Sequence, residues 1–107
     1  MRAEVSNTLG IRLYLSGPIE VAKQVIRADC LREGLCVTVE PTTFIYTGGE
    51  EAGYAVGLLN YPRFPTTYEK LNERAETLAL ALLDATHQHS ALIVGPATSK
   101  WVTRRAA

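Results

Sequence analysis

Residues 46–59 read Tyr-Thr-Gly-Gly-Glu-Glu-Ala-Gly-Tyr-Ala-Val-Gly-Leu-Leu, and this stretch decides how the chain folds. Gly48 and Gly49, with Gly53 beyond the two glutamates, predict a flexible connection, because glycine accepts the backbone conformations that turns require. Residues 54–59, which follow, are apolar on both faces, as is typical of a strand inside a sheet. The stretch therefore predicts the turn and second arm of an antiparallel hairpin.

The first arm of this hairpin lies just before the glycines. Residues 35–40 alternate apolar and polar side chains, and residues 44–46 resume the extended character after Pro41. Proline cannot donate a ladder hydrogen bond, so Pro41 indicates an edge strand or a bulge.

Upstream of the hairpin, the pattern predicts one strand and one helix. Residues 11–15 alternate like a half-buried strand, which Ser16 and Gly17 end. Pro18 fits the first turn of a helix whose apolar residues recur at helical spacing. We expect Gly34 to end this helix in a left-handed conformation.

Downstream of the hairpin, a second helix is the most clearly marked element. Thr66 and Glu69 match a capping box, and an apolar stripe continues to Thr86 or His87. Residues 90–94 then read as a strand, and residues 98–103 as a short final strand.

The order of elements predicts an α+β domain. We expect residues 1–107 to form a single ferredoxin-like domain of the βαββαβ type, with an antiparallel sheet, both helices on one face and a short C-terminal strand. The other face of the sheet is left uncovered. The usual solution for so apolar a chain is self-association, so we expect a homo-oligomer.

The composition narrows the classes of partner. The chain has 107 residues, 47% of them hydrophobic, and 11 basic side chains balance 11 acidic ones. This balance argues against nucleic acid or an anionic membrane as a partner, and no apolar run is long enough for a signal peptide or membrane span. We therefore expect a cytoplasmic protein.

The two cysteines and two histidines give little sign of metal or redox chemistry. Cys30 and Cys36 are expected to pack as small hydrophobic residues rather than form a disulfide. Neither a Cys-x-x-Cys pair nor a matching histidine pair is present, so we predict no metal and no cofactor. His87 is expected at a helix C-terminus, where a cationic ring favours the dipole.

Two passages resemble the PII and CutA superfamily of trimeric ferredoxin-like proteins: Glu-Gly-Leu-Cys-Val-Thr-Val at residues 33–39, leading to Ile45 and Tyr46, and the short strand around Trp101. The resemblance implies a homotrimer with ligand clefts between subunits, lined by the hairpin and the loop after its second strand. The chain departs from the family where Gly48 and Gly49 replace the aromatic that follows the tyrosine in CutA-like hairpins. It also lacks the phosphate-binding glycine loop of PII proteins, so ATP binding is not implied.

The loop after the hairpin, Asn-Tyr-Pro-Arg-Phe-Pro at residues 60–65, carries the strongest candidate site. Arg63 is held between prolines and can grip a carboxylate or phosphate, and Tyr61 or Phe64 can stack on a planar base. The alternative is that both aromatics fill the core and Arg63 pairs on the surface. Asn60 can cap the turn or contact a ligand.

The glycines of the hairpin are a weaker candidate. Gly48 and Gly49 can turn successive amides toward an anion, but Glu50 and Glu51 beside them would repel a phosphate, so a plain turn is favoured. The complete set of candidate ligand-binding residues is Arg63, Asn60, Tyr61, Phe64, Tyr46, Gly48 and Gly49.

The sequence contains no nucleophile motif, so we expect no enzyme and no catalytic residue. The first hypothesis is a non-enzymatic oligomer that binds a nucleotide or similar small anionic signal molecule at subunit interfaces, as a sensor or sequestering protein. A phage-encoded sponge that removes a cyclic nucleotide immune signal would suit the same architecture. A second hypothesis is an interaction module that docks through residues 46–65, and a third is a small hydrolase or isomerase that uses His87 or a hairpin glutamate.

Overall fold

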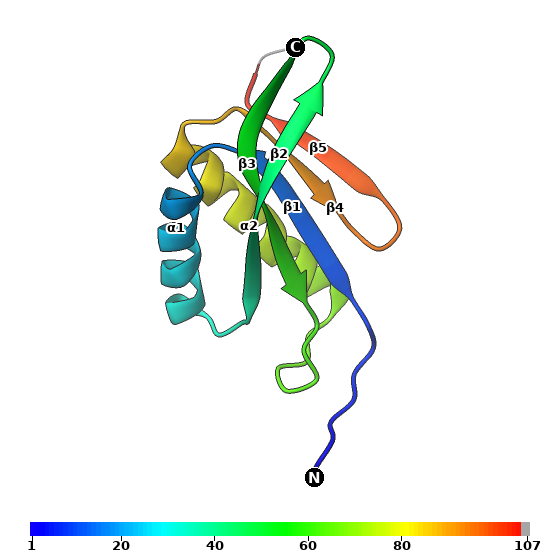
Figure 1. The fold of residues 1–107 in the computed structure, drawn as a ribbon. Coiled ribbons are helices and arrows are strands. Elements are labelled where there is room, and N and C mark those ends of the chain that lie inside the picture. Colours follow the sequence, from blue (N-terminus) through cyan, green and yellow to red (C-terminus); the bar gives the residue numbers. More distant parts are fainter. Residues whose placement is uncertain (106–107) are drawn as a thin grey trace.

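A computed structural model describes residues 1–105, so the last two residues of the predicted domain lie outside the described part of the chain. The elements in chain order are β1 (Gly10–Ser16), α1 (Ile19–Arg32), β2 (Val37–Tyr46), β3 (Gly49–Leu59), α2 (Tyr68–Thr86), β4 (Ser90–Val94) and β5 (Ser99–Thr103). The strands form one five-stranded sheet in the order β2-β3-β1-β4-β5, antiparallel throughout (Figure 1). This is an α+β, ferredoxin-like arrangement with an added C-terminal strand, and it confirms the predicted fold class.

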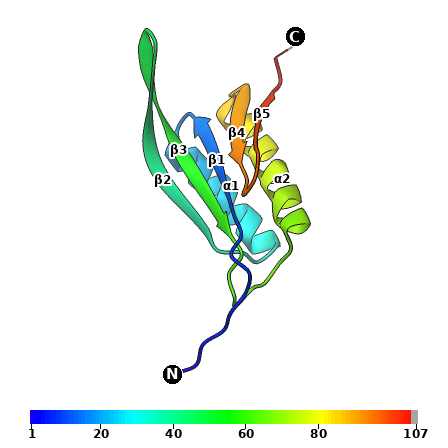
Figure 2. The ribbon, with the colours of Figure 1, turned by 90° about the vertical axis from the view of Figure 1, so that its right-hand side faces the viewer.

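Both helices pack on one face of the sheet (Figure 2). Strand alternation explains this packing: Ile11, Leu13 and Leu15 of β1 are buried, while Tyr14 between them is only half-buried. The buried side chains of β1, β3 and β4 meet the apolar stripe of α2 and the shorter one of α1 in a single core. The residues that alternate with them form the open face of the sheet.

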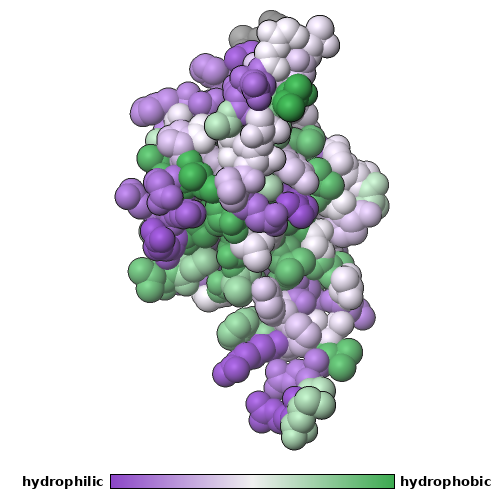
Figure 3. Space-filling view, viewed as in Figure 1, coloured by the Kyte–Doolittle hydropathy of each residue, from purple (hydrophilic) through white to green (hydrophobic). Residues whose placement is uncertain are grey.

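The β2–β3 hairpin extends beyond the rest of the sheet (Figure 1). Its register runs from Val37 opposite Leu58 to Tyr46 opposite Gly49, and the turn contains Gly48 at φ 88°. Proline is tolerated within β2 because β2 is an edge strand, which was one of the two alternatives that Pro41 indicated. Figure 3 shows apolar surface in several places between hydrophilic side chains on this side of the molecule.

The end of α1 differs from the prediction. Gly34 does not provide a left-handed stop; α1 instead ends at Arg32, and its C-cap residue Glu33 is extended with φ −146°. The guanidinium of Arg74 in α2 donates hydrogen bonds to the backbone carbonyls of Asp29, Glu33 and Gly34. A side chain from the neighbouring helix thus supplies the cap that a left-handed glycine would have provided.

The start of α2 lies one residue later than the capping-box pattern indicated. Thr67 is the N-cap, and its side chain accepts a hydrogen bond from the backbone N–H of Lys70. The helix ends at His87 in a left-handed conformation with φ 55°, where the sequence placed it. Within residues 1–105, neither helix combines the length and the hydropathy needed to cross a membrane.

Candidate functional site

The predicted site residues lie in two places rather than one. Tyr46, Gly48 and Gly49 are at the tip of the hairpin, and residues 60–64 follow the other end of β3 (Figure 1). A strand of 11 residues spans about 35 Å, so the two groups cannot bind one small ligand within a single subunit.

Asn60 is engaged in backbone contacts. Its side-chain Nδ2 donates to the carbonyl of Asn7 at 2.7 Å, and its Oδ1 accepts from the N–H of Thr66 at 2.8 Å. Its own N–H donates to the carbonyl of Leu9, and its carbonyl accepts from Ser6 Oγ. Asn60 is buried and fixes the N-terminal segment and the entry to α2 against the end of β3.

The rest of the loop is more open. Arg63 is exposed, and within residues 1–105 it forms no hydrogen bond or ion pair. Phe64 is about half exposed and lines a cavity beside α2, so it does not fill the core. Tyr61 is half-buried, and the neighbouring Cys36 thiol raises the pKa of its phenol.

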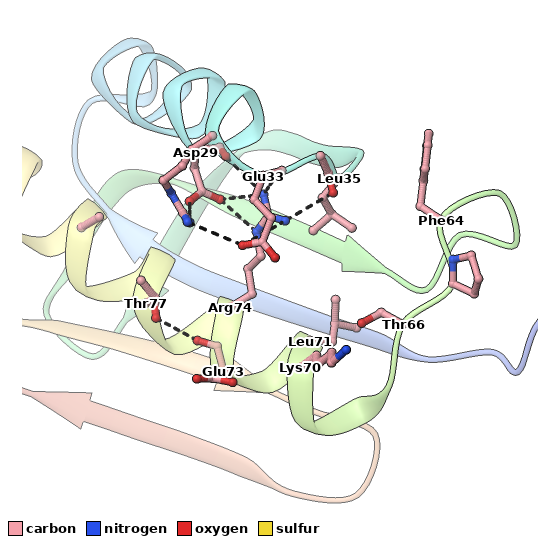
Figure 4. Close-up of a pocket in the computed structure, with 14 residues that line it drawn as sticks. Asp29, Glu33, Leu35, Phe64, Thr66, Lys70, Leu71, Glu73, Arg74 and Thr77 are labelled. Atoms are coloured by element: carbon pink, nitrogen blue, oxygen red, sulfur yellow. Dashed lines mark hydrogen bonds and ion pairs between the residues drawn. The ribbon is translucent and has the colours of Figure 1, made fainter.

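The cavity beside Phe64 has a volume of about 800 Å³ and lies between α1, α2 and the loop (Figure 4). Its charged centre is Arg74, whose guanidinium binds Asp29 Oδ2 at 3.0 Å and is only 10% exposed. Asp29 also pairs with Arg32. Because the donors of Arg74 already bind Asp29 and the end of α1, this cluster joins the two helices and leaves little capacity for a ligand.

The cysteines lie near this end of the molecule and are both free. Cys30 is half-buried in α1, and burial raises the pKa of its thiol. Cys36 is exposed just before β2. Within residues 1–105, no group of three histidine, cysteine or acidic side chains is placed to hold a metal ion.

A second cavity, of about 610 Å³, lies on the open face of the sheet. It is lined by Tyr14, Leu15, Ser16, Thr43, Phe44, Ile45, Tyr46, Glu51, Ser90, Ala91, Leu92 and Trp101. Glu51 is the only charged side chain among these residues, and four of the others are aromatic. Of the residues predicted as a site, only Tyr46 belongs to this cavity.

Sheet register brings the aromatic side chains together. Tyr14 and Phe44 meet edge to face, with ring centroids 6.5 Å apart. Trp101 of β5 pairs with Leu92 of β4, which in turn pairs with Tyr14. Trp101 is 63% exposed, so much of its apolar surface is free to contact a ligand or another chain.

Glu51 lies on β3 directly opposite Phe44 of β2. The hydroxyl of Ser16, at the end of β1, donates a hydrogen bond to Glu51 Oε1 at 2.7 Å. Nearby on the same face, Arg12 lies over the Tyr14 ring at 5.5 Å and pairs with Glu40. The cavity itself therefore combines one carboxylate with an aromatic wall.

This arrangement suits a ligand that has both a planar ring and a positive charge. Aromatic faces bind planar bases by stacking and cations through their quadrupole, and a carboxylate binds an ammonium group. Tyr14, Phe44 and Trp101 were not predicted as site residues from the sequence. Alternation within each strand would have assigned their faces, but only the register between strands shows that they share one cavity.

Comparison with known proteins gives no match to a family model or to a curated protein sequence. The structure is similar to that of a phage SAM lyase in the apo state, with a TM-score of 0.72 and 14% identity over 100% of this chain and 98% of that chain. A phage SAM lyase in complex with S-methyl-5'-thioadenosine gives a TM-score of 0.69 at 14% identity, over 96% and 95% of the two chains. At this identity the similarity shows a shared fold.

These neighbours contradict one expectation drawn from the sequence. A non-enzymatic sensor, sequestering protein or sponge was expected for this fold, whereas both neighbours are lyases and therefore enzymes. The expectation that the chain is not an enzyme is corrected on this ground.

Proposed function

We propose that this protein is a lyase that cleaves S-adenosylmethionine and releases S-methyl-5'-thioadenosine. The observation that carries the proposal is the cavity on the open face of the sheet, where Glu51 is surrounded by aromatic side chains. The fold shared with phage SAM lyases over nearly the whole chain supports it.

The chemistry of the substrate matches that of the cavity. The adenine ring can stack on Phe44, Tyr46 or Trp101, and the α-ammonium can bind the carboxylate of Glu51. The volume of about 610 Å³ lies within the usual range for small-ligand sites. No metal or redox cofactor is required, because the sulfonium is already an activated leaving group.

The role of Glu51 follows from where charge is lost. When the bond between sulfur and Cγ of the amino acid breaks, its electron pair moves to sulfur and the sulfonium becomes a neutral thioether. A carboxylate held against the sulfonium would stabilise the substrate more than the transition state and slow the reaction. The α-ammonium keeps its charge throughout, so Glu51 aids the reaction by binding that group and orienting the amino-acid chain.

Two routes can release the thioether without water. In the first, the substrate's own carboxylate oxygen displaces sulfur at Cγ and closes a five-membered lactone. In the second, a base removes a proton from Cβ and an unsaturated amino acid forms. Glu51 is the only carboxylate lining the cavity, so the second route would assign the proton transfer to it.

We further propose that a second copy of the chain covers the open face, and that the assembly is the trimer implied by the PII and CutA resemblance. Support comes from the exposure of Tyr46, Leu92 and Trp101 around the cavity. Light scattering at micromolar concentration tests this, and a monomer would contradict it.

The activity is tested by incubating purified protein with S-adenosylmethionine and following products by liquid chromatography and mass spectrometry. We expect S-methyl-5'-thioadenosine to form far faster than in buffer or with heat-denatured protein, which measure spontaneous breakdown. Carrying out the reaction in ¹⁸O-labelled water distinguishes a lyase, whose initial amino-acid product carries no label, from a hydrolase. No product above the spontaneous rate would overturn the proposal.

A further inference from the structure

We infer that Ser16 is a positioning residue for Glu51: its hydroxyl holds one carboxylate oxygen and leaves the other to bind the substrate's α-ammonium. This inference rests on the proposed function of the same cavity. It assigns a role to Ser16, which in the sequence marked only the end of a strand.

The contact between the two side chains is charge-assisted. Ser16 Oγ lies 2.7 Å from Glu51 Oε1, an ordinary hydrogen-bond distance for a hydroxyl that donates to a carboxylate. Within residues 1–105, neither a lysine nor an arginine forms an ion pair with Glu51. The hydroxyl is thus the group that orients the carboxylate, and it adds no positive charge to compete with an ammonium ligand.

The backbone under Ser16 is firmly held. Ser16 pairs with Gly53 in the ladder between β1 and β3, and the N–H of Gly17 donates to the carbonyl of Ala52. Gly17 has φ 120°, a conformation that other residues rarely adopt, and the turn leads directly into α1. The hydroxyl therefore projects from a firmly held backbone position, where β1 ends and the turn into α1 begins.

Glu51, in contrast, lies near the tip of the projecting hairpin and is exposed. A free glutamate side chain has several rotatable bonds, and ordering it when a ligand binds costs free energy. Glu51 lies two residues from Gly53 on the same strand, so its carboxylate is a diagonal neighbour of Ser16 across the ladder. The hydrogen bond orders the side chain already in the free protein and makes the carboxylate preorganised for the cation.

The inference is tested with two adenosine ligands, of which one carries the α-ammonium and the other does not. S-adenosylhomocysteine carries the α-ammonium but is not a sulfonium, and S-methyl-5'-thioadenosine lacks the amino-acid chain. In titration calorimetry, Ser16→Ala should lower the affinity for S-adenosylhomocysteine about tenfold, as expected for loss of a hydrogen bond to a charged group. The affinity for S-methyl-5'-thioadenosine should stay within about twofold of the wild-type value. Ser16→Thr keeps a hydroxyl, so its affinity for S-adenosylhomocysteine should be close to that of the wild type.

Two further variants separate positioning from structure. In a Glu51→Gln background, Ser16→Ala should have little additional effect, because the partner carboxylate is gone. Thr77→Ala removes a hydroxyl that bonds the Glu73 carbonyl on α2, away from the cavity, and should change neither affinity.

The remaining outcomes have distinct meanings. The positioning role would be overturned if Ser16→Ala lowered the affinity for both ligands equally. It would also be overturned if the effects of Ser16→Ala and Glu51→Gln on the binding free energy were additive. Wild-type protein that binds both ligands but does not cleave S-adenosylmethionine would overturn the proposed function, while the comparison of the two ligands still decides the role of Ser16. Wild-type protein that binds neither ligand would overturn both.

Discussion

The ring of Phe44 lies directly over the backbone of Gly53. A Cβ added at Gly53 would come within 2.5 Å of Phe44 Cε2 and would also collide with the carbonyl oxygen of Leu15. Because Gly53 of β3 has no side chain, the ring of Phe44 from β2 can pack against the sheet, where it lines the cavity together with Glu51.

Replacing Gly53 should damage both stability and the cavity. We expect Gly53→Ala to lower the free energy of unfolding by about 1–3 kcal/mol, since the methyl group overpacks a site bounded partly by backbone. Binding of S-methyl-5'-thioadenosine should weaken in the same variant because Phe44 is displaced. Gly34→Ala is the matched control, since a Cβ at Gly34 meets no atom within 4 Å. Urea unfolding of both variants checks this, and equal stability would contradict the packing argument.

Charge at position 51 should matter far more than charge at position 50. Glu50 and Glu51 are adjacent on β3, so their side chains point to opposite faces of the hairpin. Glu51→Gln should raise KM for S-adenosylmethionine roughly 10- to 100-fold through loss of a charged hydrogen bond, with a smaller change in kcat. Glu50→Gln should stay close to wild type. A collapse of kcat with unchanged KM would instead make Glu51 the base that forms an unsaturated amino acid.

Much of the fold could be predicted because local patterns and tertiary packing agree. The alternation of β1 and β2, the apolar stripe of α2 and the glycine turn each indicate their element independently. The predicted left-handed stop at Gly34 was wrong, because the end of α1 is capped by a side chain from another helix. That side chain is Arg74, which is 40 residues from Gly34 in the sequence. A contact at that distance leaves no local signal.

The site was less predictable for a related reason. Asn60 and Arg63 drew attention as a polar group and a cation on a stiff loop, whereas Tyr14, Phe44 and Trp101 are ordinary strand residues in the sequence. They line one cavity with Glu51 only because three strands align them there. Strand order and register are long-range properties, and periodicity within one strand does not contain them.

The contacts of Asn60 predict a structural role. Asn60→Ala should lower the free energy of unfolding by about 2–3 kcal/mol, because it removes both side-chain hydrogen bonds and leaves the N–H of Thr66 and the carbonyl of Asn7 without that partner. Affinity for S-methyl-5'-thioadenosine should not change, as Asn60 lies at the far end of β3 from the hairpin tip. Arg63→Ala is the companion variant, expected within about 0.5 kcal/mol of wild type. If Arg63→Ala instead lost affinity for S-methyl-5'-thioadenosine, the result would favour residues 60–65 as the binding site.

Arg74 should be a major determinant of stability without affecting the cavity on the open face. Its guanidinium binds both the Asp29 carboxylate and the carbonyls at the end of α1, and both side chains are largely buried. Arg74→Met keeps the apolar stem but leaves Asp29 without this partner, so we expect a loss of about 2–3 kcal/mol in urea unfolding.

Arg32→Met provides the control on the same carboxylate. Arg32 also pairs with Asp29, but its side chain is 59% exposed, so its removal should lower the stability much less than removal of Arg74. Both variants should bind S-methyl-5'-thioadenosine like wild type, because α2 and the cavity are on opposite faces of the sheet. Similar losses for Arg32→Met and Arg74→Met would contradict the expectation that the buried Arg74, and not the exposed Arg32, is the stabilising partner of Asp29.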